Sequence, residues 1–532
     1  MIVYFSGTML EMLLALTLIV TSLLRLHMTT VRFFDPDEFA HLHWAYLIAR
    51  GNVPYRDIFM YHIPVFQVFL LPLMLLVHSS HILILARLGM FVAVGLFLLL
   101  LYRVSYCITK NTKTTLLVVL IASIFPIGLD KLLEIRPDTL MMVFLVGSIC
   151  IAWSRKRVFF SGLLFGLALL TLPKVLFALP ALIYLTGLTS VLIPFFAGAL
   201  LPFWGFALYI VALGITPTAL DAIAGASRAV FVERTFSPWL GFAPWPLVYL
   251  DRGGISFPWI VSTMLWIVAC IGIFFLPSRR AKVFFLLYFS FGLISLTQFP
   301  SPHIQYHIPL ALMASIPAGI VLTKLLSRQL FVGVLCGVFL VSVWQQWTVR
   351  TNPQNRNTEQ LTVIGDILRI SRPDETVYDM VGSYVFRPDG YTICCHRYGA
   401  FIDKLRIKPP PLWHELIARK TKFIILDRSG FSLWVTPEPD LSFIQKNYLP
   451  SGYPKIYTLG FAFECHQGTC SPNTVFSVII AETYRISTNP PGASVAIDGR
   501  EIIDNNEFQL QEGNHRISVP PTITSLNVQL AR

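Results

Sequence analysis

The sequence predicts a polytopic α-helical membrane protein followed by a soluble C-terminal region. Of its 532 residues, 55% are hydrophobic and 13% are charged, and the mean hydropathy is +0.65. A soluble protein of this length carries about twice that charged fraction. Apolar runs of helical length recur from Met9 to about Trp347, and after Arg350 they stop and the composition turns polar. Such recurrent runs are typical of helices that cross a bilayer.

The apolar runs predict about eleven membrane crossings, each close to the length of roughly 20 residues that a spanning helix needs. They lie near residues 9–28, 82–102, 114–129, 139–153, 158–172, 175–189, 191–213, 258–276, 283–299, 305–323 and 329–347. The run 63–77 is apolar but short, and it contains Pro64 and Pro72. We therefore expect a re-entrant or interfacial segment there and not a full crossing.

Basic residues predict the orientation, because short cytoplasmic loops carry an excess of Lys and Arg. With the N-terminus inside, the inner loops contain no acid and the following bases: Arg103, Lys110, Lys113, Arg155, Lys156, Arg157, Arg279, Arg280, Lys282, Lys324 and Arg328. Every Asp and Glu between residues 12 and 350 then falls on the outer side. One signal disagrees, since Arg25 and Arg32 follow the first run. The net charge of +12 therefore reflects orientation in a membrane, and no nucleic-acid partner is expected.

The stretch 32–61, which follows the first crossing, contains a predicted helix with a capped start. Asp35 suits the N-cap, Pro36 the first helical position, and Glu38 the third position of a capping box. Asp37 is then the carboxylate left for chemistry. The alternative is an amphipathic helix lying on the membrane, with its acids present only for the helix dipole.

Four further segments bring ionisable residues to the same predicted outer side. They are the DKLLEIRPD segment with Asp130, Glu134, Arg136 and Asp138; Lys174 in TLPK; the loop 214–257; and QFPSPHIQYHIPL with His303, Gln305, Tyr306 and His307. Ionisable groups at membrane depth are costly, so this gathering predicts a site. Each also has a structural explanation. Lys174 could reach the headgroups, the histidines could bond at the interface, and Glu134 with Arg136 could be an ion pair.

The tail divides by pattern into two parts. Helix-like and strand-like stretches alternate over about 358–483, which predicts an α/β or α+β domain. From 484 to 532, short strands separated by Pro-Gly and Asp-Gly turns predict a small all-β module. In an extracytoplasmic tail, Cys465 and Cys470 could close a disulfide loop, and a metal pair with His466 is the weaker alternative.

These residue types together suit transfer from a lipid-phosphate donor. A carboxylate on the first outer helix can act as a general base toward an acceptor hydroxyl. Basic groups on the same side can bind a phosphate and stabilise it as it departs. No phosphate-binding loop or dinucleotide fingerprint occurs in the sequence, so a nucleotide donor has no evident cradle.

Residues 1–350 resemble the polytopic glycosyltransferases that use polyprenyl-phosphate sugars, including protein O-mannosyltransferases and aminoarabinose transferases. The matching residues are Asp37-Glu38, EIRPD at 134–138, GLLFGLALLTLPK ending at Lys174, and QYHIPL at 305–310. The resemblance implies Asp37 as catalytic base, with Glu38 either supporting it or orienting the acceptor. It also implies Lys174 with Arg56 or Arg136 near the donor phosphate, and Tyr61, His62, Tyr306 or His307 in the pocket. Glu134, Asp138 and His303 complete the expected substrate-binding set.

One departure and one addition distinguish this sequence from the family's usual pattern. The usual Lys-Pro-Pro after the first-loop helix is replaced by Tyr61-His62-Ile63-Pro64. His62 could replace that lysine only while protonated. The last segment looks like a PEGA-type β module, a binding unit or a plain β domain. We expect no metal or other cofactor, an inverting displacement, and a bacterial inner-membrane location with the C-terminal domains periplasmic.

Two other classes of function compete with the transferase. A transporter or flippase of a lipid-linked substrate predicts related halves and ion sites near the midplane. No convincing internal repeat is seen in the sequence, and the charges lie at one side. A membrane-anchored binding protein would depend on its tail, and truncation near residue 350 is expected to separate it from an enzyme. The sugar, the acceptor and the lipid length are not specified by the sequence.

Overall fold

The computed structural model describes residues 7–125, 131–187, 192–232, 257–297, 304–325, 355–395, 408–426, 438–466 and 474–532, with a few residues between these ranges. The chain forms two compact units. The first contains residues 1–34, 60–73 and 82–357. The second contains residues 35–59, 74–81 and 358–532. The stretch with Asp37, expected in the first outer loop, is thus grouped with the C-terminal region.

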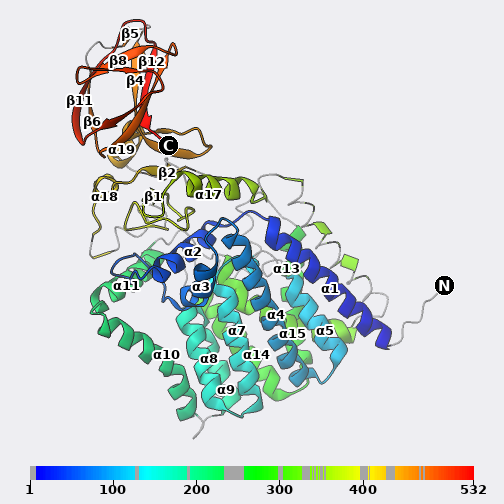
Figure 1. Ribbon diagram of the computed structural model, residues 1–532. Helices are drawn as coiled ribbons and strands as arrows, with labels where there is room; N and C mark the ends of the chain where they lie inside the picture. The colour runs from blue at the N-terminus through cyan, green and yellow to red at the C-terminus, as the bar shows by residue number, and fades with distance from the viewer. Residues whose placement is uncertain are drawn as a thin grey trace, which may run out of the picture. The chain divides into compact units, whose positions relative to one another are not determined.

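The first unit is a bundle of helices (Figure 1). Its elements are α1 (Gly7–Val31), α4 (Ile82–Thr109), α5 (Thr112–Ile124), α7 (Pro137–Ser154), α8 (Val158–Thr171), η1 (Pro173–Ala178), α9 (Leu179–Thr186), α10 (Leu192–Ala212), α11 (Thr216–Val232), α13 (Phe257–Phe275), α14 (Arg279–Thr297), η3 (Ile304–His307) and α15 (Ile308–Leu325). The short helix α3 (Val65–Leu76) contains Pro72 and belongs partly to each unit. Its 12 residues agree with the expected short segment.

Five helices are long and apolar enough to cross a membrane: Thr8–Val31, Ile82–Thr109, Pro137–Ser154, Leu192–Ala212 and Gln305–Leu325. Shorter apolar helices cover Val65–Leu76, Thr112–Ile124, Val158–Thr171, Pro173–Thr186 and Met264–Phe275. The chain is therefore a multi-pass membrane protein, as predicted, and the number of eleven crossings stays a prediction. The expected crossing at 329–347 lies largely outside the described residues. The expected outer loop 214–257 contains the helix α11 in its first part.

Glycines bring α8 and α10 into backbone contact. A Cβ atom placed on Gly162 would lie 1.9 Å from the carbonyl oxygen of Phe195, and one on Gly198 would lie 2.1 Å from that of Phe159. Gly162 and Gly166 form a GxxxG pattern on α8. Close helix approach through small residues is the usual packing in membranes, where no hydrophobic force draws apolar helices together.

The second unit contains the helix α2 (Pro36–Ala49) and the C-terminal elements. These are α17 (Thr358–Ile370), β1 (Val377–Tyr378), α18 (Leu412–Ala418), β2 (Phe423–Ile425), α19 (Asp440–Asn447), β3 (Tyr448–Pro450), β4 (Ile456–His466), β5 (Thr469–Cys470), β6 (Thr474–Val478), β7 (Glu482–Asn489), β8 (Ser494–Ile497), β9 (Arg500–Ile503), β10 (Glu507–Leu510), β11 (Gly513–Ser518) and β12 (Ser525–Leu530). The mixture of helix and strand agrees with the predicted fold class of the tail.

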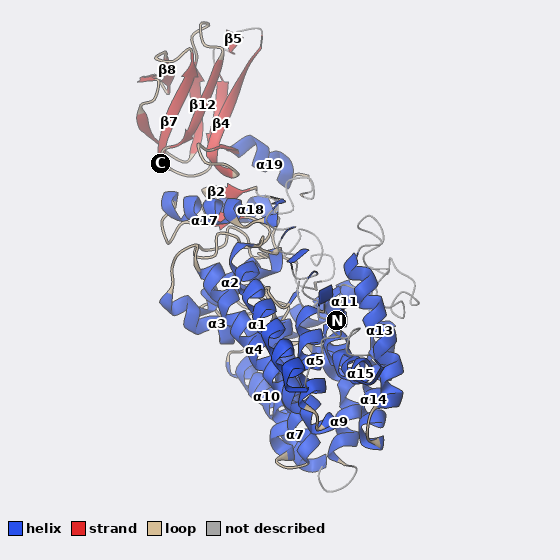
Figure 2. Ribbon diagram, turned by 90° about the vertical axis from the view of Figure 1, so that its right-hand side faces the viewer, coloured by secondary structure: helices blue, strands red, loops and turns tan. Residues whose placement is uncertain are grey.

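Two sheets share one apolar core in this unit. The first has the order β1-β2-β4-β12-β7-β10, with β3 and β5 also paired to β4, and the second has the order β6-β11-β8-β9. Val528 and Ile486 from the first sheet are buried in one cluster with Ile517 and Val495 from the second. Figure 2 shows β12 between β4 and β7. Residues 484–532 therefore share both sheets with strands from 456–483.

The predicted strand around ETVYDMVG is short. It forms only the two residues of β1, Val377 and Tyr378, which pair parallel with β2. The next residue, Asp379, accepts hydrogen bonds from the backbone N–H groups of Val381, Gly382 and Ser383. Because these N–H groups bond to a side chain, they are not available to a sheet, and the chain turns.

Candidate functional site

The predicted cap of α2 is confirmed. The Asp35 carboxylate accepts from the backbone N–H of Asp37 at 3.1 Å, and the Glu38 carboxylate accepts from the N–H of Asp35 at 2.8 Å. Pro36 occupies the first turn, and Gly51 after the helix has a φ of +89°. The cap uses the carboxylates of Asp35 and Glu38, but only the backbone of Asp37. Glu38 is buried and Asp37 is half-buried.

The alternative of an amphipathic helix on the membrane surface is wrong in one respect, because α2 has no long exposed polar face. Every residue from Glu38 to Leu47 is buried, including His41, His43 and Trp44. His43 donates from Nδ1 to the Val385 carbonyl at 2.7 Å, and its Nε2 lies 2.7 Å from the Asp389 carboxylate. Partners more than 300 residues away thus cover the face that a surface helix would expose to water.

The imidazole of His43 is fully buried beside the carboxylate of Asp389. Burial works against the imidazolium, but the Asp389 carboxylate and the Val385 carbonyl outweigh it and raise the pKa of His43. The Tyr384 hydroxyl donates to the same Asp389 carboxylate, and burial with that neighbouring charge raises the pKa of Tyr384. His43, Asp389 and Tyr384 therefore form one buried hydrogen-bonded cluster that joins α2 to the segment after β1.

The same region holds the cysteines Cys394 and Cys395, which form a disulfide between adjacent residues. The ligand atoms of His43, Cys394 and Cys395 lie within 4.8 Å of one another, as in a metal site. In this state the two sulfurs are bonded to each other, and both His43 nitrogens have hydrogen-bond partners. The expected loop at CHQGTC has a backbone in which Cys465 and Cys470 are directly opposed on β4 and β5.

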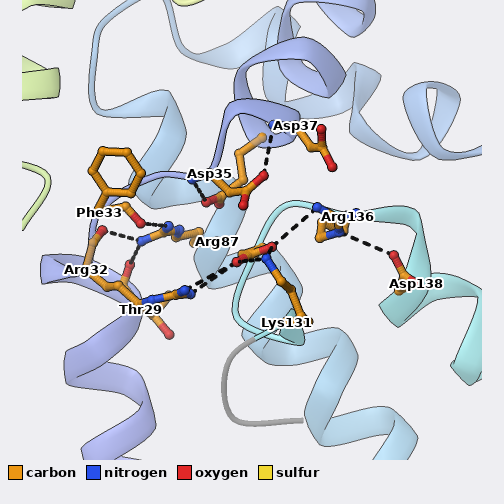
Figure 3. A network of polar contacts seen from close by, with 11 residues as sticks. Thr29, Arg32, Phe33, Asp35, Asp37, Arg87, Lys131, Arg136 and Asp138 are labelled. Atoms are coloured by element: carbon orange, nitrogen blue, oxygen red, sulfur yellow. Dashed lines mark hydrogen bonds and ion pairs between the residues drawn. The ribbon is translucent and has the colours of Figure 1, made fainter. Parts of the chain in front are cut away.

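The first unit contains a network of buried charges at one end of its helices (Figure 3). Arg87 on α4 anchors the end of α1. Its guanidinium donates to the carbonyls of Arg32 and Phe33, each at 2.7 Å, and lies 4.1 Å over the Phe34 ring. Arg87 is itself fully buried. The chain leaving α1 is therefore held rigidly, and Arg32 points toward the turn before α7.

Glu134 is the centre of this network. Its carboxylate is fully buried and is approached by Lys131 at 2.9 Å, Arg32 at 3.3 Å and Arg136 at 3.5 Å. A buried carboxylate without partners would cost several kcal/mol, on the order of the desolvation penalty of one ion. Three cations around one acid more than compensate its charge.

Asp138 continues the network toward η1. Arg136 Nε lies 3.4 Å from the Asp138 carboxylate, and the Lys174 ammonium donates to the other oxygen of that carboxylate. Lys174 also donates to the Gln305 carbonyl at 2.6 Å and lies 5.7 Å from the centroid of the Tyr306 ring. Its side chain is only 7% exposed, so it does not reach the headgroups as the alternative for this lysine required.

Part of the expected convergence is seen within the first unit, between the end of α1, the DKLLEIRPD segment, Lys174 and Gln305. Residues from the end of α1, the turn before α7, α7 and η1 meet in one cluster, which we call the cationic cluster: Arg32, Lys131, Glu134, Arg136, Asp138 and Lys174. Four cations surround two carboxylates, which leaves two positive charges in excess among these six residues. Guanidinium and ammonium groups gathered in this way can bind the oxygens of a phosphate ester through charge-assisted hydrogen bonds.

The remaining expected residues have different surroundings. Tyr61 and His62 lie against each other, with ring centroids 4.1 Å apart, in the first unit. His307 is buried next to Tyr306. Arg56 is exposed and pairs with Asp57 in the second unit at 2.8 Å, and that hydrogen bond lowers the pKa of Asp57. His303 lies outside the described residues.

Three functional candidates were not among the predicted site residues. Arg32 and Lys131 bind the carboxylate of Glu134, and Arg87 holds the end of α1. Arg87 had a signal in the sequence, because it is an arginine inside an apolar run, where a charge indicates an interior partner. Lys131 also had a signal, because it lies three residues before Glu134 in the DKLLEIRPD segment. Arg32 had none beyond its place after the first apolar run, because Glu134 is 102 residues away.

No protein family matches the sequence, and no curated protein is similar to it at a significant level. Among solved structures, the chain is similar to the crystal structure of ArnT from Cupriavidus metallidurans bound to undecaprenyl phosphate. The identity is 12% and the TM-score 0.47, over 67% of this chain and 72% of that chain. At this level the similarity carries no argument about chemistry, which rests on the residues of this chain.

Proposed function

We propose that this membrane protein is a glycosyltransferase that moves a sugar from a polyprenyl-phosphate donor to an acceptor on the extracytoplasmic side of a bacterial inner membrane. The observation that carries the proposal is the convergence of four cationic side chains from separate segments in the cationic cluster. The side chains of Arg136 and Lys174 are only 8% and 7% exposed among apolar helices, and ionisable groups held at such a depth mark a functional site by default. A phosphate attached to a lipid can reach the cationic cluster between these apolar helices without leaving the bilayer.

The donor phosphate is assigned to Lys174 and Arg136, with Arg32 and Lys131 adding to the positive potential. Guanidinium and ammonium groups bind phosphate through charge-assisted hydrogen bonds. They also stabilise the negative charge that grows on the phosphate as the sugar leaves. Tyr306 and His307, beside Lys174, and the pair Tyr61 and His62 are assigned to the lining of the sugar pocket.

Asp37 is assigned as the general base and Glu38 as the group that positions it. The capping box fixes the first turn of α2, so the backbone of Asp37 is held by two flanking side-chain hydrogen bonds. A base must lie within hydrogen-bond reach of the proton it removes, and a capped, buried helix end provides that rigidity.

The reaction is a single displacement. The acceptor oxygen attacks the anomeric carbon while its proton passes to the Asp37 carboxylate. The bond between the anomeric carbon and the phosphate oxygen breaks, and its electron pair leaves with the polyprenyl phosphate. The configuration at the anomeric carbon is inverted. The cations supply the stabilisation of the leaving group that the displacement needs.

The test is incubation of the purified full-length protein with radiolabelled polyprenyl-phosphate sugars and a membrane extract. We expect label to move to a new product with the wild type and with Asp366→Asn, a control whose carboxylate pairs with the exposed Arg369 at 2.7 Å in the same unit. Asp37→Asn is expected to lose transfer by at least about 100-fold, the lower range for a general base, while it still binds the donor. Transfer by Asp37→Asn at the wild-type rate would reject the assignment of the base.

The same material distinguishes the alternative of a flippase. In sealed vesicles, a flippase moves the labelled lipid across the bilayer without forming a new product. A transferase forms the product and releases polyprenyl phosphate. Movement of intact donor with no product would replace the proposed function.

A further inference from the structure

A second set of cations lies at helix ends that the cationic cluster does not include. Arg155 follows α7, and Arg280 is in the first turn of α14. Both donate to one acceptor, the Leu185 carbonyl in the last turn of α9, Arg155 at 3.2 Å and Arg280 at 2.9 Å. Arg280 also donates to the Ala152 carbonyl of α7 at 3.3 Å. Two loops that sequence analysis assigned to the same side therefore meet at one carbonyl.

These cations have no local acids. The sequence has no Asp or Glu between residues 139 and 220, or between 252 and 358. The four further bases in the two loops are Lys156, Arg157, Arg279 and Lys282. Within the described residues, the ends of α7 and α9 offer only carbonyl dipoles, which correspond to about half a charge per helix. Two guanidinium groups on one carbonyl are thus left with an excess of positive charge.

Among the described residues, only part of the Arg280 guanidinium takes part in hydrogen bonds. It packs over the Trp153 ring at 5.1 Å, and among the described residues its buried Nε has no hydrogen-bond partner. The turn that presents Arg155 has an unusual backbone, since Arg155 and Arg157 have φ values of 54° and 56°. Non-glycine residues in this region cost about 1 kcal/mol or more, and such strain recurs at ligand sites.

Apolar surface continues from these loops along the helices. Phe160 on α8, whose N–H bonds to the Arg157 carbonyl, is 52% exposed, and Leu286 on α14 is 49% exposed. A ligand with a phosphate at one end and acyl chains at the other fits this succession of positive charge and apolar side chains. Free phosphate would use the charges but not the apolar surface.

We propose that Arg155 and Arg280 form a binding site for the phosphate headgroup of an anionic phospholipid, with Arg157 and Arg279 at its rim. Each guanidinium offers a planar pair of N–H groups that matches phosphate oxygens. Basic pockets between transmembrane helices on the cytoplasmic side are known places for such lipids. This site is independent of the proposed transferase function, because it shares no residue with the cationic cluster.

The test uses the full-length protein in nanodiscs and detergent. Lipid retained by the protein is measured by native mass spectrometry, and thermal unfolding is followed with phosphatidylglycerol or phosphatidylcholine added. We expect phosphatidylglycerol to be retained and to raise the Tm of the wild type. The double variant Arg155→Gln, Arg280→Gln is expected to lose about 30-fold in affinity for phosphatidylglycerol, given the roughly 1 kcal/mol that each base contributes near an anionic surface.

The matched control is Arg103→Gln, Lys110→Gln, which removes two exposed charges, one from the last two turns of α4 and one from the turn between α4 and α5. It is expected to keep most of the affinity. An equal loss in both double variants would mean general attraction to a basic surface and would overturn the site. Both arginines also donate to carbonyls at helix ends, so a variant that keeps the positive charge is needed beside the glutamine variant. For Arg155→Lys, Arg280→Lys, the lipid-induced shift in Tm is compared with that of the wild type. Stabilisation of the wild type by inorganic phosphate as large as that by phosphatidylglycerol would overturn the assignment to a lipid.

Discussion

At the scale of single residues, buried charges in both units are held by partners distant in sequence. Lys174 pairs with Asp138 and donates to the Gln305 carbonyl, and His43 lies between Val385 and Asp389. The sequence identifies Lys174 and His43 as polar groups in apolar surroundings, but it does not identify the residues to which they bond. The roles of these groups can be separated from their structural contribution by paired substitutions.

The pair Lys174 and Asp138 distinguishes binding from stability. Lys174→Met leaves a buried carboxylate with less compensation, so we expect a loss of about 3–5 kcal/mol in the free energy of unfolding. Adding Asp138→Asn removes that charge and should restore most of the stability. Donor binding should stay weak in the double variant, because the phosphate has lost its ammonium partner. Thermal unfolding and binding of a polyprenyl phosphate are measured side by side, and recovery of both would make the pair purely structural.

The raised pKa of His43 predicts that the free energy of unfolding of the second unit depends on pH. Its pKa in the folded protein is raised, so the protonated form stabilises the second unit fully at pH below about 6.5, the ordinary pKa of the imidazole. That contribution is lost as the pH rises through the folded-state pKa. We expect the Tm of the wild type to fall in this range, and the Tm of His43→Gln to change less. Parallel curves for the two proteins, measured by thermal unfolding from pH 5 to 9, would contradict the prediction.

At the scale of elements, backbone contact between α8 and α10 depends on glycine. Gly162→Val places atoms where the Phe195 carbonyl lies, so the helices must separate. Overpacking of this kind costs about 1–3 kcal/mol and occasionally more. Gly205→Val on α10 is the matched control, because a Cβ there has no neighbour within 4 Å among the described atoms. Thermal unfolding in detergent should show a lower Tm for Gly162→Val and little change for Gly205→Val.

At the scale of the whole molecule, the C-terminal region contributes to the unit that contains α2. The expectation that truncation near residue 350 separates an enzyme from a tail-driven binder is therefore weakened. Truncation after Asn357 removes Val385 and Asp389 and leaves His43 and the buried face of α2 without their partners. We expect the truncated chain to lose transfer and to be cleaved by protease within 35–59. Full-length Asp37→Asn should lose transfer while it resists protease like the wild type, and an active, protease-resistant truncation would refute this account.

The sequence alone determined the features that depend on neighbours along the chain. The capping box of α2 needs only positions 35–38, and the apolar runs identify helices that cross a membrane, because both follow from local bonding and composition. Tertiary structure decided which charges meet. Arg32 binds Glu134, His43 binds Asp389, and β12 lies between β4 and β7, each through contacts between residues far apart in sequence. Such pairings depend on how the elements pack, and no local periodicity records them.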